Sequence, residues 1–218
     1  MDSVSVKLLA DGTVYVVEEE GAVIKEKLIE PDSLLKLIES SAYSEITDSY
    51  GSVLPKNCIY YGVMERRSGL PVQVVMVERE RCVRPYNHFG SVEMVGYPKL
   101  VFAYKISGAD IISSAVVAAT DEVISEDSPL YYFPYANVFF TGKICTGTYH
   151  YPKIRSLADL TYLPEDFYLI EHTHERNAAG EVIREILDQV KEKPFDDSLL
   201  KFFKTFGQFV REYQEETR

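Results

Sequence analysis

Short turns join the β-prone segments in the middle of the chain, and this arrangement leaves few folds open to it. A Ser-Gly pair at residues 68–69 separates the first two segments, and residues 107–110 separate the last two. Turn-forming residues between short apolar runs are typical of β-hairpins. The pattern predicts a four-stranded antiparallel meander, with strands over residues 58–65, 72–79, 100–106 and 111–119.

The first thirty residues carry a second β pattern. Apolar and polar residues alternate at its start, and Asp11-Gly12 is a strong signal for a two-residue hairpin turn. Three short antiparallel strands are expected here. Pro31 then opens a helix whose leucines recur at helical spacing. The predicted domains are an N-terminal β segment over residues 1–30 and a main domain over residues 31–218.

The last part of the chain has helical periodicity. Residues 181–193 form one predicted helix, which Pro194 ends. Residues 195–216 form another, with apolar side chains at every third or fourth position. Residues 84–96 are rich in turn formers and are predicted to be a loop. Together with the strands, these helices predict an α+β fold with a C-terminal helical extension.

An excess of acidic residues excludes two classes of partner. Lys and Arg total 23 and Asp and Glu total 34, which gives a net charge of −11 at pH 7. A phosphate surface repels such a chain, so we expect it to bind neither nucleic acid nor an anionic membrane. The sequence also lacks a phosphate-binding glycine motif, so no nucleotide cofactor is expected.

The three cysteines are too few for a disulfide scaffold. The N-terminus has no basic region followed by a long apolar run, so no signal peptide is expected. Both observations predict a cytoplasmic location. Cys58 and Cys82 lie in apolar segments and are predicted to be structural, because a free cysteine behaves as a small apolar residue.

Residues 127–152 lack a regular period and are rich in aromatic residues, Pro and Gly. Long ordered loops of this kind tend to be functional. Cys145 lies in this stretch between Gly142 and Gly147, and a lysine two residues before it favours the thiolate that a nucleophile needs. Cys145 is therefore the candidate nucleophile.

The stretch around Cys145 resembles the active-site motif of ubiquitin-conjugating enzymes. In that family an Asn lies eight residues before the catalytic Cys, with a Gly-containing turn between them, and Asn137 stands at this spacing. The resemblance is greatest to prokaryotic family D, which includes the PRTRC cassette protein B group. The residues that match its motif are Pro134, Asn137, Val138, Gly142, Cys145 and Gly147.

This resemblance implies a ubiquitin-conjugating-enzyme-like fold: a helix, a four-stranded antiparallel meander, an active-site loop and C-terminal helices. The segment over residues 1–30 is an addition to that fold. The implied function is to accept a ubiquitin-like protein from a ThiF-type activating enzyme as a Cys thioester. The modifier then passes to an amine, such as a lysine of a target protein. A JAB-type peptidase belongs to the same implied bacterial pathway, and antiphage defence or plasmid maintenance is the implied setting.

The resemblance also implies roles for individual residues. Cys145 would form the thioester, and Asn137 would donate to the oxyanion or brace the loop. Tyr135 and Ala136 stand where the family has His and Pro, so the turn is braced in another way, with Tyr135, Gly142 and Gly147 as possible supports. An acidic residue past the Cys would orient the incoming lysine. The candidates for it are Asp159, Glu165 and Asp166.

Two other interpretations stay open, and a third is disfavoured. The chain could use the same fold as a noncatalytic binding module, with Cys145 incidental. His150 lies five residues after Cys145, and a Cys–His pair would indicate a cysteine hydrolase. His172 and His174 could bind zinc as in JAB-type metalloproteases, whose motif continues with Pro, Ser and Asp. Those positions hold Glu175, Val182 and Glu185, so no metal site is predicted.

Overall fold

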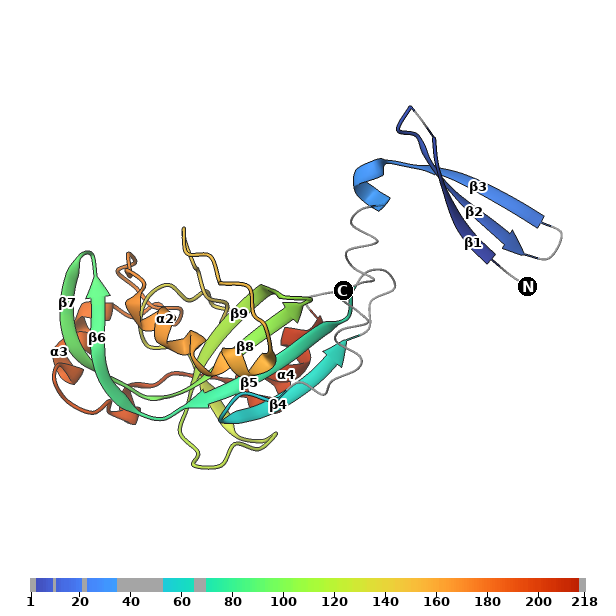
Figure 1. Cartoon of the computed structure of the whole chain (residues 1–218). Helices are drawn as coiled ribbons and strands as arrows, with labels where there is room; N and C mark the ends of the chain where they lie inside the picture. The colour runs from blue at the N-terminus through green and yellow to red at the C-terminus, as the bar shows by residue number, and fades with distance from the viewer. Residues whose placement is uncertain (1–2, 10, 21–22, 35–52, 65–69, 216–218) are drawn as a thin grey trace. The chain divides into compact units, whose positions relative to one another are not determined.

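The computed structural model describes residues 3–9, 11–20, 23–34, 53–64 and 70–215. The chain divides into two compact units (Figure 1), one of Met1–Gly51 with Arg67–Leu70 and the other of Ser52–Arg66 with Pro71–Arg218. Among the described residues, no helix is both long and apolar enough to cross a membrane. The domain boundary at residue 30 stays a prediction.

The N-terminal unit contains an antiparallel sheet in the order β1-β2-β3, as the sequence predicts. Its strands are β1 (Ser3–Leu8), β2 (Val14–Glu20) and β3 (Val23–Ile29). The Asp11 carboxylate accepts a 3.0 Å hydrogen bond from the Thr13 backbone N–H, and Gly12 has a φ of 87°. The Asp-Gly pair thus forms the turn between β1 and β2. Residues 31–34 are helical, and the rest of the predicted helix lies outside the described residues.

The second unit is built on a six-stranded antiparallel sheet in the order β11-β10-β9-β8-β5-β4. Four neighbouring strands of this sheet, β4, β5, β8 and β9, form the predicted meander. The bounds are β4 Cys58–Met64, β5 Val72–Arg79, β8 Lys99–Ser107, β9 Asp110–Ala119, β10 Pro129–Tyr131 and β11 Phe202–Thr205. The α+β class with mainly antiparallel strands is therefore confirmed.

The prediction of a loop over residues 84–96 is wrong. β6 (Cys82–His88) and β7 (Ser91–Tyr97) form a separate two-stranded antiparallel ribbon, which lies between β5 and β8 in the sequence. The turn residues Phe89 and Gly90 both have positive φ, which suits a tight hairpin. Proline has no backbone N–H. Pro85 is tolerated because one edge of each strand in a two-stranded ribbon forms no hydrogen bonds to a neighbouring strand.

The C-terminal prediction is partly wrong. α3 (Ile183–Val190) lies within the predicted helix 181–193. The helix predicted over 195–216 is replaced in its first half by the 3₁₀ turn η2 (Asp197–Leu199) and strand β11, and α4 covers only Phe206–Glu215. Pairing with β10 supplies β11 with backbone partners that override the helical spacing of its phenylalanines.

Two short helical elements precede α3 and have no counterpart in the predictions. They are the 3₁₀ turn η1 (Leu157–Thr161) and helix α2 (Leu163–Leu169). α2 has only seven residues, and Pro164 lies in its first turn, where a missing N–H costs nothing. Such a short helix gives little periodic signal in the sequence.

The sheet of the second unit has an apolar core on each face. Side chains alternate along β8, so Phe102 and Tyr104 pack toward one core and Val101 toward the other. The first core includes α2, α3 and the β6-β7 ribbon, and the second is covered by α4 (Figure 1). Tyr213 of α4 donates a 3.2 Å hydrogen bond to the Ala103 carbonyl. The sheet is thus fixed between two layers, and its loops carry the candidate site.

Replacing Gly96 with alanine is expected to destabilise the second unit severely. A Cβ at Gly96 would lie less than 3 Å from backbone atoms of Lys193, Pro194 and Phe195, and backbone cannot rotate away as a side chain can. We expect the free energy of unfolding in urea to fall by at least about 3 kcal/mol. Val92→Ala on the same strand is the control, because Val92 is 63% exposed. Equal stability of the two variants would contradict the prediction.

Candidate functional site

Asn137 and Cys145 face each other across a tight hairpin. The Cys145 backbone N–H donates to the Asn137 carbonyl at 2.8 Å, and the Phe139 N–H donates to the Lys143 carbonyl at 2.8 Å. Gly142 adopts a φ of 86°, the left-handed conformation that glycine accepts without strain. The eight-residue spacing therefore has a physical meaning, because it is the separation that closes this hairpin on itself.

The hairpin is fixed to strand β9. The Ile144 N–H donates to the Ser114 carbonyl at 3.0 Å, and the Val116 N–H donates to the Gly142 carbonyl at 2.9 Å. These bonds extend the sheet alongside the middle of β9. Cys145 follows directly after the last of these anchored residues, so its backbone is placed by the sheet while its side chain is half-buried.

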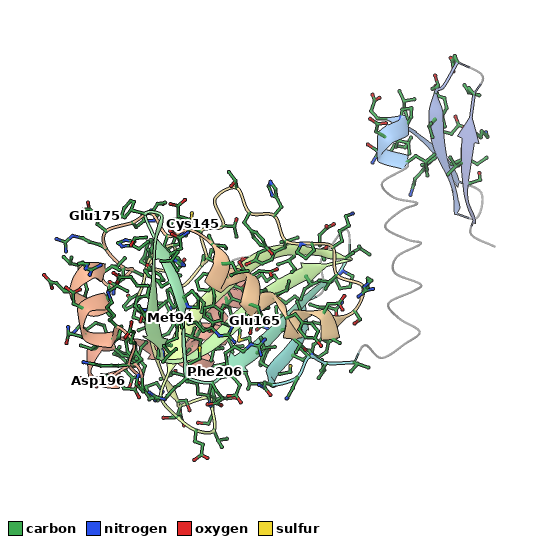
Figure 2. The ribbon with its side chains drawn as sticks, turned by 60° about the vertical axis from the view of Figure 1, so that its left-hand side comes forward. Met94, Cys145, Glu165, Glu175, Asp196 and Phe206 are labelled. Atoms are coloured by element: carbon green, nitrogen blue, oxygen red, sulfur yellow. The ribbon has the colours of Figure 1, made fainter. Side chains whose placement is uncertain are left out.

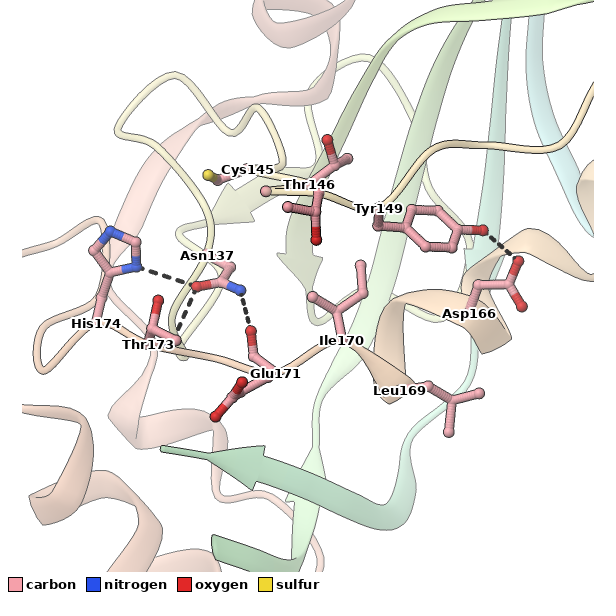
Figure 3. Close-up of a pocket in the computed structure, with 12 residues that line it drawn as sticks. Asn137, Cys145, Thr146, Tyr149, Asp166, Leu169, Ile170, Glu171, Thr173 and His174 are labelled. Atoms are coloured by element: carbon pink, nitrogen blue, oxygen red, sulfur yellow. Dashed lines mark hydrogen bonds between the residues drawn. The ribbon is translucent and has the colours of Figure 1, made fainter. Parts of the chain in front are cut away.

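The Asn137 side chain connects the hairpin to a second segment, residues 171–174. Its Nδ2 donates to the Glu171 carbonyl at 2.8 Å, and its Oδ1 accepts from the Thr173 N–H at 3.4 Å and from His174 Nδ1 at 3.1 Å. Asn137 itself has a φ of 62°, which asparagine tolerates better than most residues. Both ends of its amide therefore brace this loop, as Figure 3 shows.

Strand β6 holds the 171–174 segment in turn. The His172 N–H donates to the Asn87 carbonyl at 2.8 Å, and the Phe89 N–H donates to the His172 carbonyl at 3.0 Å. His88 Nε2 donates to the His174 carbonyl at 2.9 Å. The β6-β7 ribbon, which the sequence predicted as a loop, is thus the support on which this side of the site rests.

A cavity of about 640 Å³ opens between the hairpin, α2 and the 171–174 segment. In Figure 2, Cys145 lies toward the same edge of the unit as Glu175, the residue after His174. At the other end of the cavity the Tyr149 hydroxyl donates to the Asp166 carboxylate at 2.6 Å. Residues that line the cavity are Asn137, Cys145, Thr146, Gly147, Thr148, Tyr149, Asp166, Leu169, Ile170, Glu171, Thr173 and His174.

Only one of the three candidate acids borders this cavity, and it is Asp166. The Asp159 carboxylate accepts from the Arg155 backbone N–H at 2.9 Å, which lowers its pKa, and lies outside the cavity lining. Glu165 forms an ion pair with Arg84 at 2.6 Å and does not line the cavity. Of the acids named from the sequence, Asp166 alone lines the cavity that Cys145 borders.

The three residues proposed to support the turn also lie in different places. Gly147 lines the cavity, whereas Gly142 is buried under the hairpin against Val117 and Phe209. Tyr135 is fully buried and donates its hydroxyl to the Gly96 carbonyl. It therefore stabilises the core beneath the loop and does not reach the cavity.

The histidines named from the sequence do not share one site. His150 borders a different cavity, next to Lys143 and Tyr151. His172 is fully buried and donates Nδ1 to the Ala136 carbonyl at 3.2 Å, whereas His174 is exposed at the cavity. Within the described part of the chain, no group of three or more His, Cys, Asp or Glu side chains is arranged to hold a metal ion.

The burial of His172 predicts a loss of stability in acid. Burial disfavours the charged ring and lowers its pKa to about 4, and the neighbouring His88 and His174 act in the same direction. The pKa of such a histidine is lower in the folded than in the unfolded protein. Its contribution to stability is fully present at pH values above the unfolded-state pKa, and it is lost as the pH falls toward the folded-state pKa. We expect the free energy of unfolding in urea to drop by about 2 kcal/mol from pH 7 to pH 5 on this account.

This pH dependence is tested by comparing two variants. His172→Gln should remove most of the drop in unfolding free energy between the two pH values, because glutamine does not titrate. His150→Gln, at an exposed histidine, should keep the drop. A native drop that persists in the His172 variant would mean that another group causes it.

The sequence did not predict that His174 lines the cavity and contacts Asn137. The two lie far apart along the chain, and only the fold of the 171–174 segment against β6 brings them together. The His-Thr-His pattern drew attention to this residue for metal binding rather than for a place beside a thiol.

Comparison with known families now identifies the chain. The model of prokaryotic E2 family D matches residues 37–206, which include the Asn137–Cys145 hairpin, the 171–174 segment and the main sheet. The chain belongs to prokaryotic E2 family D. The resemblance drawn from the Asn–Cys motif is thereby confirmed, and this family has a ubiquitin-conjugation-type role. Neither a curated protein nor a solved structure matches the chain. Strands β1–β3 lie outside the family match.

Proposed function

We propose that this family D protein carries a ubiquitin-like protein as a thioester on Cys145 and transfers it to an amine. The observation that carries the proposal is the closed hairpin that pairs Asn137 with Cys145 at the mouth of an open cavity. A half-buried thiol there is reachable by a protein's C-terminus, and a thioester keeps the acyl group activated for the next transfer.

Asn137 is proposed to serve the transfer in two ways. Its amide braces the hairpin against residues 171–174. Its Nδ2 carries two hydrogens, and one of them is free of the Glu171 carbonyl. That second N–H would donate to the oxyanion that develops when an amine attacks the thioester.

The order of elements along the chain supports a ubiquitin-conjugating-enzyme-like fold. A helical turn at residues 31–34 precedes the meander β4-β5-β8-β9, and the Cys145 hairpin follows it, with α2, α3 and α4 toward the C-terminus. This is the order of elements that such a fold requires. The β6-β7 ribbon and strand β11 would be family-specific additions to it.

The proposed partners are those that the family resemblance implies. A ThiF-type activating enzyme would supply the modifier, a target lysine would receive it, and a JAB-type peptidase would release it. Asp166 and the Tyr149 hydroxyl form a polar end of the cavity where an incoming ammonium group could be held. No cofactor is needed for exchange between thioesters, because the activating enzyme performs the ATP-dependent step. A cytoplasmic setting in a bacterial pathway is proposed with them.

The test is reconstitution with ThiF-type activating enzymes and ubiquitin-like proteins from the organism that encodes this chain. With ATP, the native chain is expected to form an adduct that thiol reductants cleave. Cys145→Ser should form an adduct that resists thiols but is cleaved by base, because an oxygen ester replaces the thioester. If neither the native chain nor Cys145→Ser forms an adduct while the activating enzyme is charged with the modifier, the proposal fails.

A cysteine hydrolase is the second candidate, and one observation favours it. Cys145, His174 and Asn137 border one cavity, and this set of residue types also serves cysteine hydrolases. A hydrolase would release a leaving group from the modifier's C-terminus without ATP. Such release by the native chain alone, lost in Cys145→Ser, would favour hydrolysis over transfer.

A further inference from the structure

His174 and Cys145 meet at one cavity from different segments of the fold. Cys145 closes the hairpin on β9, and His174 ends the segment that β6 supports. Both side chains line the cavity, and the side chain of Asn137, from the same hairpin as Cys145, reaches His174 (Figure 3). An imidazole in this position is exposed to whatever molecule approaches the thiol.

The hydrogen bonds fix the tautomer of His174. Asn137 Nδ2 donates to the Glu171 carbonyl, which assigns Oδ1 to the side of Thr173 and His174. Because Oδ1 can only accept, His174 Nδ1 carries a proton. The neutral ring then has its lone pair on Nε2, and no hydrogen bond from the described residues engages that atom. His174 is therefore oriented as an imidazole base with a free acceptor.

We infer that His174 is the general base of amine transfer, an inference that rests on the proposed thioester function. The amine nitrogen forms a bond to the thioester carbonyl carbon while His174 Nε2 takes its proton. The bond from that carbon to Cys145 Sγ then breaks, and the electron pair leaves on sulfur as a thiolate. Asn137 acts as a positioning residue toward His174, because its Oδ1 holds Nδ1 and so directs the ring.

The other titratable groups of the cavity suit this role less well. The Asp166 carboxylate is engaged by the Tyr149 hydroxyl at the end of the cavity away from Cys145. The Glu171 side chain is directed away from Cys145 in Figure 3, although its backbone carbonyl binds Asn137. His174 alone combines a fixed orientation with a free basic nitrogen.

The experiment uses a small acyl donor, so that it needs no protein partner. An acetylglycyl thioester of mercaptoethanesulfonate would exchange onto Cys145 of the full chain, and intact mass spectrometry would follow the bound acyl group. The loaded chain is then discharged with lysine, whose amine is mostly protonated at neutral pH, or with hydroxylamine, whose nitrogen is mostly neutral there. Only the first nucleophile needs a strong general base.

His174→Asn is the decisive variant, because its amide N–H can still donate to Asn137 Oδ1 while the base is gone. We expect it to load normally, to discharge to lysine about 100-fold more slowly than the native chain, and to discharge to hydroxylamine within about threefold of it. His150→Asn is the matched control, since His150 lies outside this cavity, and it should discharge to both nucleophiles at the native rates.

The outcomes separate the inference from the function beneath it. Normal loading with unchanged lysine discharge in His174→Asn would overturn the inference and leave the carrier function standing. An equal slowing with both nucleophiles would also overturn it, because a merely structural role does not distinguish them. If the native chain loads at Cys145 neither from this donor nor from the charged activating enzyme, the inference and the carrier function both fall.

Discussion

Cys145→Ala is expected to abolish conjugation, with the rate reduced at least ~1000-fold, because no other group in the cavity can form a thioester. The fold should survive the change. The hydrogen bond that places Cys145 comes from its backbone N–H to the Asn137 carbonyl, and alanine keeps it. Unfolding in urea should therefore be close to native, which distinguishes loss of chemistry from loss of structure. The measurement is the rate of modifier transfer in the reconstituted system.

The other two cysteines provide the controls. The Cys58 thiol donates to the Tyr60 carbonyl at 3.3 Å within β4, and Cys82 packs against the core at the start of β6. Neither lines the Cys145 cavity. Cys58→Ala and Cys82→Ala should conjugate at native rates. Conjugation by Cys145→Ala at the native rate would overturn the assignment of Cys145 as the carrier.

The meander was predictable because local signals and tertiary structure agree there. The turn formers between β8 and β9 lie where the strands reverse, and a buried strand such as β8 reads as a continuous apolar run. The β6-β7 ribbon was missed because Pro85, Asn87 and Gly90 resemble a loop when their neighbours are unknown. Its stability comes from Tyr86, which is buried against Tyr135 and His172, and this contact cannot be read from spacing.

Strand β11 shows the opposite error. Phe202, Phe203 and Phe206 recur at helical spacing, and the sequence alone favours one long helix. In the structure, Phe203 packs against Tyr132 while its neighbours pair with β10, so partners far along the chain decide the conformation. The helix begins only at Phe206, where α4 covers the second core.

The candidate site was predictable only as far as one segment reaches. Asn137, Gly142 and Cys145 belong to one hairpin, so their spacing records their geometry. His174 and Asp166 reach the cavity through α2 and the segment after it, and nothing in their spacing from Cys145 reports this. The sequence therefore pointed to Cys145 as the candidate nucleophile, and the fold was needed to find what surrounds it.

Asn137→Gly is expected to slow transfer from Cys145 about 100-fold, although the Cys145 thiol itself is unchanged. It deletes the proposed oxyanion donor and releases both His174 and the Glu171 carbonyl. Glycine accepts the φ of 62° without strain, so this variant isolates the side chain. Asn137→Ala adds a Cβ in the left-handed region, which should lower the free energy of unfolding by about a further 1 kcal/mol relative to glycine. Discharge of the loaded chain to lysine and unfolding in urea measure the two effects.

The double variant Asn137→Gly/His174→Asn then tests whether the two side chains act as one unit. If Asn137 orients His174, removing the base from a chain that has already lost its orienting partner should cost much less than the ~100-fold expected in the native background. Multiplicative losses would mean that Asn137 acts on the oxyanion independently of His174. A native discharge rate in Asn137→Gly would exclude both roles, because the left-handed backbone at position 137 would then be all that the hairpin needs from this residue.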